Sequence, residues 1–118
     1  PSILIWLIQE GSQGRFLSGV NAPSPLLAAI SEQSLKNGLP VYAPILDDVD
    51  KSAVPISALW GFFEDEVTEA SKRYQTDLFS VVRVRNEFGK RVVDLRVFFY
   101  QYSEVIFSLF LLKYHLYL

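Results

Sequence analysis

An uninterrupted apolar run near the start of the chain restricts the possible fold more than any other feature. Residues 3–8 (ILIWLI) are six apolar residues without alternation, and polar and glycine residues follow them. A strand of this kind has to be covered on both faces. We therefore predict a central strand here, then a turn at residues 11–14 and a short antiparallel strand at residues 15–18.

The next segment carries the start and stop signals of a helix. Ser24 is a good capping residue, and Pro25 follows it at the first helical position. Gly38 and Pro40 supply the matching stop. The sequence therefore predicts a helix over residues 25–37.

A second strand and a longer helix are predicted downstream. Residues 41–46 are β-rich, and the acidic residues 47–50 read as a polar connection. A helix is then expected from about residue 55 to Tyr74, because its apolar residues fall on one helical face: Leu59, Trp60, Phe63, Val67, Ala70 and Tyr74. Such an amphipathic helix is expected to lie on a sheet.

The segments 78–85 and 91–100 have the pattern of a β-hairpin with a short loop around Gly89. Alternation of apolar and charged residues predicts its register. The expected opposite pairs are Arg85 and Val92, Arg83 and Asp94, Val81 and Arg96, Val84 and Val93, Val82 and Leu95, and Ser80 and Val97. One face of the hairpin is then apolar and the other carries an opposite-charge pair.

These elements predict an α/β fold, that is, an α+β sandwich with a mixed four- or five-stranded sheet and two helices on one face. The expected order is strand, a possible second strand, helix, strand, helix, strand, strand. We predict one domain over residues 1–102, cut from a longer polypeptide. Residues 103–118 form a hydrophobic tail without clear periodicity, which is not assigned to the domain.

Composition excludes several function classes. The 118 residues include no Cys and a single His, His115, near the end of the chain, which removes thiolate nucleophiles, Cys/His zinc sites and histidine triads drawn from its body. The formal charge of -2 argues against nucleic-acid binding. No apolar run has the length of a membrane span. We expect no cofactor, and a binding role is favoured over catalysis.

Three acidic residues form the one cluster with metal-binding potential. Asp47, Asp48 and Asp50 follow a predicted strand, where α/β folds often place ligands, and carboxylates suit Mg²⁺ or Ca²⁺. The stretch lacks the glycine and the later glutamate of an EF-hand loop. The alternative is an ordinary turn, because Asp is common in turns.

Two further features suggest contact with a partner. Arg83, Arg85 and Arg91, with Lys90 and Arg96, concentrate positive charge on the predicted hairpin. Phe62 lies off the apolar face of the predicted helix and is a candidate exposed anchor. The alternative for the arginines is a solvated outer face that protects a sheet edge.

Four segments together carry a family resemblance: ILIWLI, PVYAPILDDVD, SALWGFF and EASKRYQTDLFSVVRV. They resemble the family known as domain of unknown function 2066. The resemblance implies a Gram-negative protein exported to the periplasm behind a signal peptide, with no established activity and no catalytic residue. After Asp94 the chain departs from the family pattern, which has a tryptophan-containing strand and a further helix, and we hypothesise a truncated or shifted reading frame there.

The leading hypothesis is a non-catalytic domain of the bacterial cell envelope that binds an unidentified envelope protein through Phe62 or the hairpin arginines. One alternative is a metal-dependent hydrolase or small-ligand-binding domain centred on the acidic residues 47–50. Another is binding to an anionic surface through Arg83, Arg85, Lys90 and Arg91, with affinity that falls as salt rises.

Overall fold

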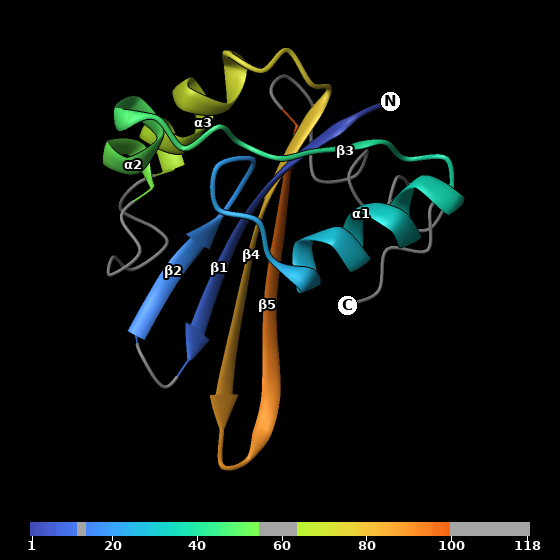
Figure 1. Ribbon diagram of the computed structural model, residues 1–118. Helices are drawn as coiled ribbons and strands as arrows, with labels where there is room; N and C mark the ends of the chain where they lie inside the picture. The colour runs from blue at the N-terminus through green and yellow to red at the C-terminus, as the bar shows by residue number, and fades with distance from the viewer. Residues whose placement is uncertain (12–13, 55–63, 100–118) are drawn as a thin grey trace.

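The computed structural model describes residues 1–11, 14–54 and 64–99, which form a mixed five-stranded sheet with short helices (Figure 1). The strands are β1 (Ile3–Gly11), β2 (Gly14–Ser18), β3 (Val41–Tyr42), β4 (Leu78–Glu87) and β5 (Lys90–Phe99). Their order is β2-β1-β4-β5, and β3 pairs with the first residues of β1. The helices are α1 (Pro25–Lys36), α2 (Asp48–Ala53) and α3 (Glu64–Lys72). The α/β class and the mixed sheet are as predicted.

β1 is the central strand that its composition predicts. It runs antiparallel to β2 and parallel to β3 and β4. Ile3, Ile5 and Leu7 pack in one core cluster with Leu27 of α1. The alternate residues of β1 pack in a second cluster with α2 and α3; these are Leu4, Trp6 and Ile8. The apolar run therefore supplies two cores, one on each face.

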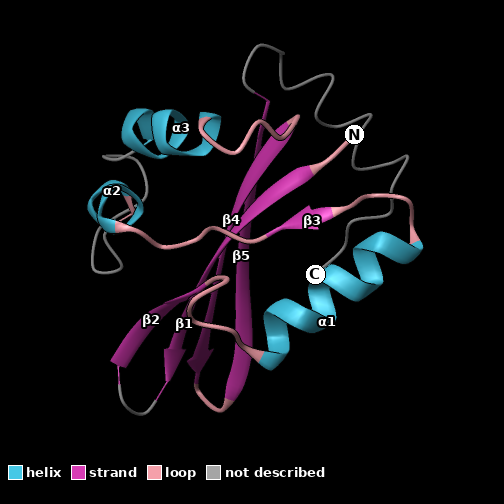
Figure 2. Cartoon of the chain, turned by 45° about the horizontal axis from the view of Figure 1, so that its top comes forward, coloured by secondary structure: helices cyan, strands magenta, loops and turns pink. Residues whose placement is uncertain are grey.

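The expectation that the helices share one face of the sheet is wrong. α1 covers one face, whereas α2 and α3 cover the other, and Figure 2 shows the sheet between them. The physical reason lies in the strand order. β3 and β4 both run parallel to β1 and lie on its two sides. The chain therefore crosses in one direction between β1 and β3, and in the opposite direction between β3 and β4. Right-handed crossovers in opposite directions place their helices on opposite faces.

The helix boundaries follow the local signals in part. The Ser24 hydroxyl accepts the Leu27 N–H at 3.2 Å, and α1 ends one residue earlier than predicted. The strand predicted over residues 41–46 is only two residues long, because Pro44 has no N–H for a sheet and Leu46 has a φ of 67°. The residues expected to be a polar connection instead begin α2.

The longer helix predicted from about residue 55 is described only from Glu64, the start of α3. Val67 and Ala70 are buried as expected, and Tyr74 lies in the turn after the helix. Leu59, Trp60, Phe62 and Phe63 lie outside the described residues, as do the boundary predicted at residue 102, the tail 103–118 and His115. No helix among the described residues is long and apolar enough to cross a membrane.

The predicted hairpin register is confirmed for every pair from Ser80–Val97 to Arg85–Val92. Glu87 faces Lys90, so Phe88 and Gly89 form a two-residue loop. The first hairpin is also as predicted, with Gly11 opposite Gly14. Short-range alternation is sufficient to set the register of the β4–β5 hairpin, because a slip by one residue would turn its apolar face outward.

Candidate functional site

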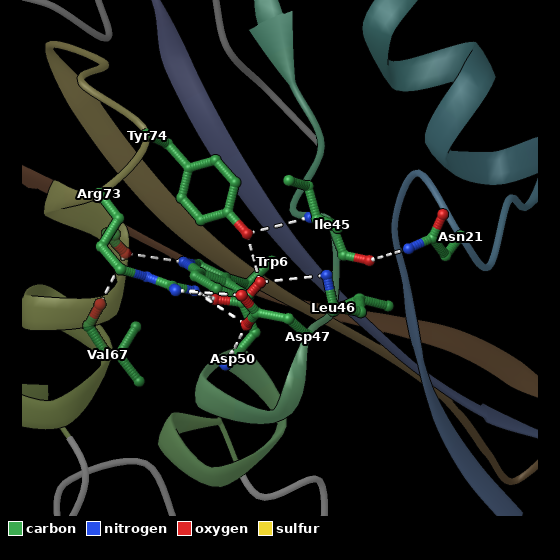
Figure 3. Close-up of polar contacts among 10 residues, drawn as sticks. Trp6, Asn21, Ile45, Leu46, Asp47, Asp50, Val67, Arg73 and Tyr74 are labelled. Carbon is green, nitrogen blue, oxygen red and sulfur yellow. Dashed lines mark hydrogen bonds and ion pairs between the residues drawn. The ribbon is translucent and has the colours of Figure 1, made fainter.

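Two loops are locked together at the edge of the sheet near β3. The Val20 N–H donates to the Pro44 carbonyl at 2.8 Å, and the Asn21 side-chain amide donates to the Ile45 carbonyl at 2.9 Å (Figure 3). Gly19 makes this approach possible, because a Cβ at that position would lie 2.3 Å from the Pro44 carbonyl oxygen. The loop of residues 19–22 therefore fixes the connection of residues 43–47 from one side.

Asp50 fixes the same connection from the other side. Its carboxylate is fully buried and accepts the Leu46 N–H at 3.0 Å and the Tyr74 hydroxyl. Its second oxygen accepts from Arg73. The Tyr74 hydroxyl in turn accepts the Ile45 N–H at 3.0 Å. Leu46 is thereby held in a left-handed conformation that a non-glycine residue rarely adopts.

Asp47 joins this group as the cap of α2. Its side chain accepts the Asp50 N–H at 3.0 Å and receives two hydrogen bonds from Arg73, at 3.0 and 2.9 Å. Hydrogen bonding to Arg73 is the main reason that the pKa of Asp47 falls to about 2, and the same bond raises the pKa of Arg73. The bidentate pair therefore ties the start of α2 to the turn after α3.

Tyr74 links the acidic group to the core. Burial, and next the hydrogen bond to Asp50, raise the pKa of Tyr74 to about 12. The Tyr74 ring meets the Trp6 ring edge to face, with 6.2 Å between their centroids. Trp6 donates its indole N–H to Ser71 at 2.8 Å, and Ser71 donates to the Val67 carbonyl at 2.6 Å. Through Tyr74, the cluster of Asp47, Asp50 and Arg73 therefore contacts the central strand β1 at Trp6, and Trp6 in turn is hydrogen-bonded to α3.

The predicted acidic cluster is thus only partly brought together. Asp47 and Asp50 converge on Arg73, while Asp48 is exposed in the first turn of α2. Among the side chains that the structure describes, no three acidic or histidine side chains stand close enough to hold a metal ion. The two converging carboxylates are committed to protein donors, and their arrangement fits a structural cluster. The sequence reading missed Arg73 and Tyr74, which are 23 and 24 residues from Asp50.

The hairpin arginines predicted as interaction residues are separated by the pleat of the sheet. Arg83 is half-buried, and Arg85 pairs with Asp94 and, at 3.4 Å, with Glu87. Arg91 is exposed and, by its register opposite Asn86, lies on the other face. Phe62, the fourth predicted residue, lies outside the described part of the chain. The structure therefore does not gather these residues into one surface.

In the described part of the chain, exposed apolar side chains are most frequent on the two hydrogen-bonded segments near β3. Four of the seven large hydrophobic residues exposed in the described part belong to the loop 19–22 or to the chain around residues 42–49; these are Val20, Tyr42, Ile45 and Val49. We call these four residues the connection surface. Isolated exposed hydrophobics are ordinary, but a concentration on two hydrogen-bonded segments is typical of a binding surface.

Comparison with known proteins adds no assignment. No family model, no curated protein and no solved structure matches this chain. The resemblance to domain of unknown function 2066 therefore stays a prediction from the sequence.

Proposed function

We propose that this chain is a non-catalytic protein-interaction domain of the bacterial cell envelope. The observation that carries the proposal is the connection surface, where four large apolar side chains are exposed on two segments that hydrogen-bond to each other. Removing apolar surface of this kind from water is favourable, so a partner that covers it would be bound. The periplasmic location comes from the family resemblance alone and is part of the proposal.

The rigidity of the backbone beneath the connection surface supports a binding role. Ile45 offers its N–H to Tyr74 and its carbonyl to Asn21, while its side chain is 49% exposed. Both backbone groups are thus held by the protein, and the side chain is left outside. A surface held in one conformation loses little entropy when it binds, which favours affinity.

The alternative of a metal-dependent or small-ligand site at residues 47–50 has less support. A hard cation needs several carboxylate or carbonyl oxygens that are free to coordinate it. Here Arg73 already pairs with both Asp47 and Asp50, and the Leu46 N–H and the Tyr74 hydroxyl occupy one oxygen of Asp50. A cation would have to displace these donors before it could bind.

A photo-crosslinking amino acid at position 45 in tagged protein tests the proposal in living Gram-negative cells. Leu35 is the matched control position, because it is an apolar residue 62% exposed on α1, which covers the sheet face away from α2 and α3. We expect a discrete protein adduct from position 45 and none from position 35. The adduct should weaken when Val20→Ser is added, because Val20 belongs to the same surface. Equal adducts from both positions, or none from position 45, would refute the proposal.

A further inference from the structure

The tip of the β4–β5 hairpin exposes an aromatic side chain that the fold does not use. Phe88 is 97% exposed, the highest value among the exposed large hydrophobics of the described residues. The last pairing of β4 with β1 joins Val84 to Gln9, so the hairpin continues beyond the sheet as a two-stranded ribbon. Figure 1 shows this ribbon extending past the end of the β1–β2 hairpin. Phe88 therefore projects from the body of the protein.

The turn itself would favour a different residue. Phe88 has a φ of 52° and Gly89 a φ of 76°, and the loop between Glu87 and Lys90 has two residues. Two consecutive left-handed residues are the mark of a type I′ turn, which prefers Asn, Asp or Gly at its first position. A phenylalanine there is both strained and without packing. Such an outlier is a reason to look for a function.

The charges at the tip indicate what it binds. Lys90 and Arg91 follow the turn, are exposed and form no ion pair with any described residue. Glu87 is the acidic residue next to the turn, and its Oε2 lies 3.4 Å from Nη2 of Arg85. The chain as a whole has a formal charge of -2, so this end is locally positive on a negative molecule. An anionic surface would attract the tip and repel the remainder, and thereby orient the protein.

We propose that the β4–β5 tip binds the surface of an anionic phospholipid bilayer. Phe88 enters the boundary between headgroups and acyl chains, and Lys90 and Arg91 contact the lipid phosphates. The ribbon is convex and projects a single aromatic side chain, which suits insertion into a soft interface. The connection surface is not involved, so this inference does not depend on the proposed function. It restricts the anionic-surface hypothesis to the tip and leaves out Arg83, which pairs with Ile8 within the sheet, and Arg85, which is paired with Asp94.

Vesicle flotation with the full 118-residue chain tests the inference. The probe is phosphatidylcholine vesicles with or without about one-third phosphatidylglycerol, at low and at roughly 0.15 M ionic strength. We expect binding only to the anionic vesicles, weakening as salt rises. Soluble glycerol phosphate at the same phosphate concentration should not compete, because it offers no interface for Phe88. Effective competition, equal binding to both vesicles or no binding would overturn the inference.

Two variants identify the residues responsible. Phe88→Asn should reduce binding to anionic vesicles about tenfold, since it removes the inserted apolar side chain. It should not impair folding, because Asn suits the turn better than Phe does. Lys90→Gln with Arg91→Gln should reduce binding by roughly fivefold for each cation removed.

The matched control for charge is Lys36→Gln with Lys51→Gln, which removes the same charge from α1 and α2. At roughly 0.15 M ionic strength that control should lower binding by less than about twofold, because Lys36 and Lys51 lie on α1 and α2 and not on the tip, and salt screens exposed charges away from the contact. Binding that survives Phe88→Asn unchanged, or a control that loses as much as the tip variant, would show that general electrostatics and not the tip causes the association.

Discussion

Replacing Asp50 by Ala should destabilise the fold by about 1–3 kcal/mol. The substitution leaves the buried Leu46 N–H without its acceptor, at a cost of about 1–3 kcal/mol. Tyr74 loses a charged acceptor but keeps the Ile45 N–H, and its half-buried hydroxyl can turn towards water. The loss of the Asp50–Arg73 ion pair adds little to the destabilisation, because the Arg73 side chain is 39% exposed and remains paired with Asp47.

Urea unfolding followed by far-ultraviolet circular dichroism measures this loss. Asp48→Ala is the matched control, since Asp48 lies two residues away in the same helix and is exposed. It should cost less than about 1 kcal/mol, which is the value of an acidic residue near a helix N-terminus. A loss in Asp50→Ala no larger than in the control would refute the assignment of Asp50 as the structural centre of the cluster.

Asp50→Ala also distinguishes a structural role of the Asp47–Asp50–Arg73 cluster from a cation-binding role. Carboxylates gathered for a cation repel one another when no cation is bound, so removing one of them would stabilise the protein in the absence of metal. Carboxylates gathered around Arg73 attract it, so removing Asp50 has the opposite sign. Stabilisation in Asp50→Ala, together with a rise of the wild-type unfolding midpoint on adding Mg²⁺, would support the cation site.

Three further outcomes are expected. Gly19→Ala should lose about 1–3 kcal/mol in urea unfolding because its Cβ meets a carbonyl oxygen, whereas Gly11→Ala, with nothing within 4 Å, should not. Phe88→Asn should raise the free energy of unfolding measured in urea by about 0.5–1 kcal/mol. Phenolate absorbance should show that Tyr74 titrates near pH 12. Because folding raises the pKa of Tyr74, its contribution to stability should be lost as pH rises from 10.0 towards 12. Because folding lowers the pKa of Asp47, its contribution should be lost as pH falls from 3.8 towards 2. Titration of Tyr74 at an ordinary pKa would contradict its bond to Asp50.

Local patterns predicted those parts of the fold that depend on neighbouring residues. The cap at Ser24 and the register of the β4–β5 hairpin are examples, since each follows from a spacing of a few residues. The side of the sheet that each helix covers depends on strand order, which no local pattern contains. Sequential order alone did not show that β1 lies between β3 and β4.

The candidate site was predictable only in part for the same reason. The acidic residues were visible as a cluster, but their meaning depends on Arg73 and Tyr74, which approach only after α3 has packed on the sheet. One signal was available. An Arg-Tyr pair directly after an amphipathic helix offers both a cation and a hydroxyl to carboxylates elsewhere in the chain. The exposure of Ile45 and Val49 had no such signal, because it depends on which loops meet.

The left-handed residues of the chain show how a structural cause can be separated from a functional one. Gln75 ends the turn after α3, where its N–H donates to the Lys72 carbonyl at 3.2 Å. Leu46 is buried, and Asp50 holds its N–H. In both cases the surrounding contacts account for the conformation. At Phe88 the turn accounts for the backbone but nothing described accounts for the side chain, which Asn or Gly would replace at a gain in stability. A residue that costs stability and packs against no described part of its own chain is best explained by contact with something outside it, which is the reason we assign the hairpin tip to binding.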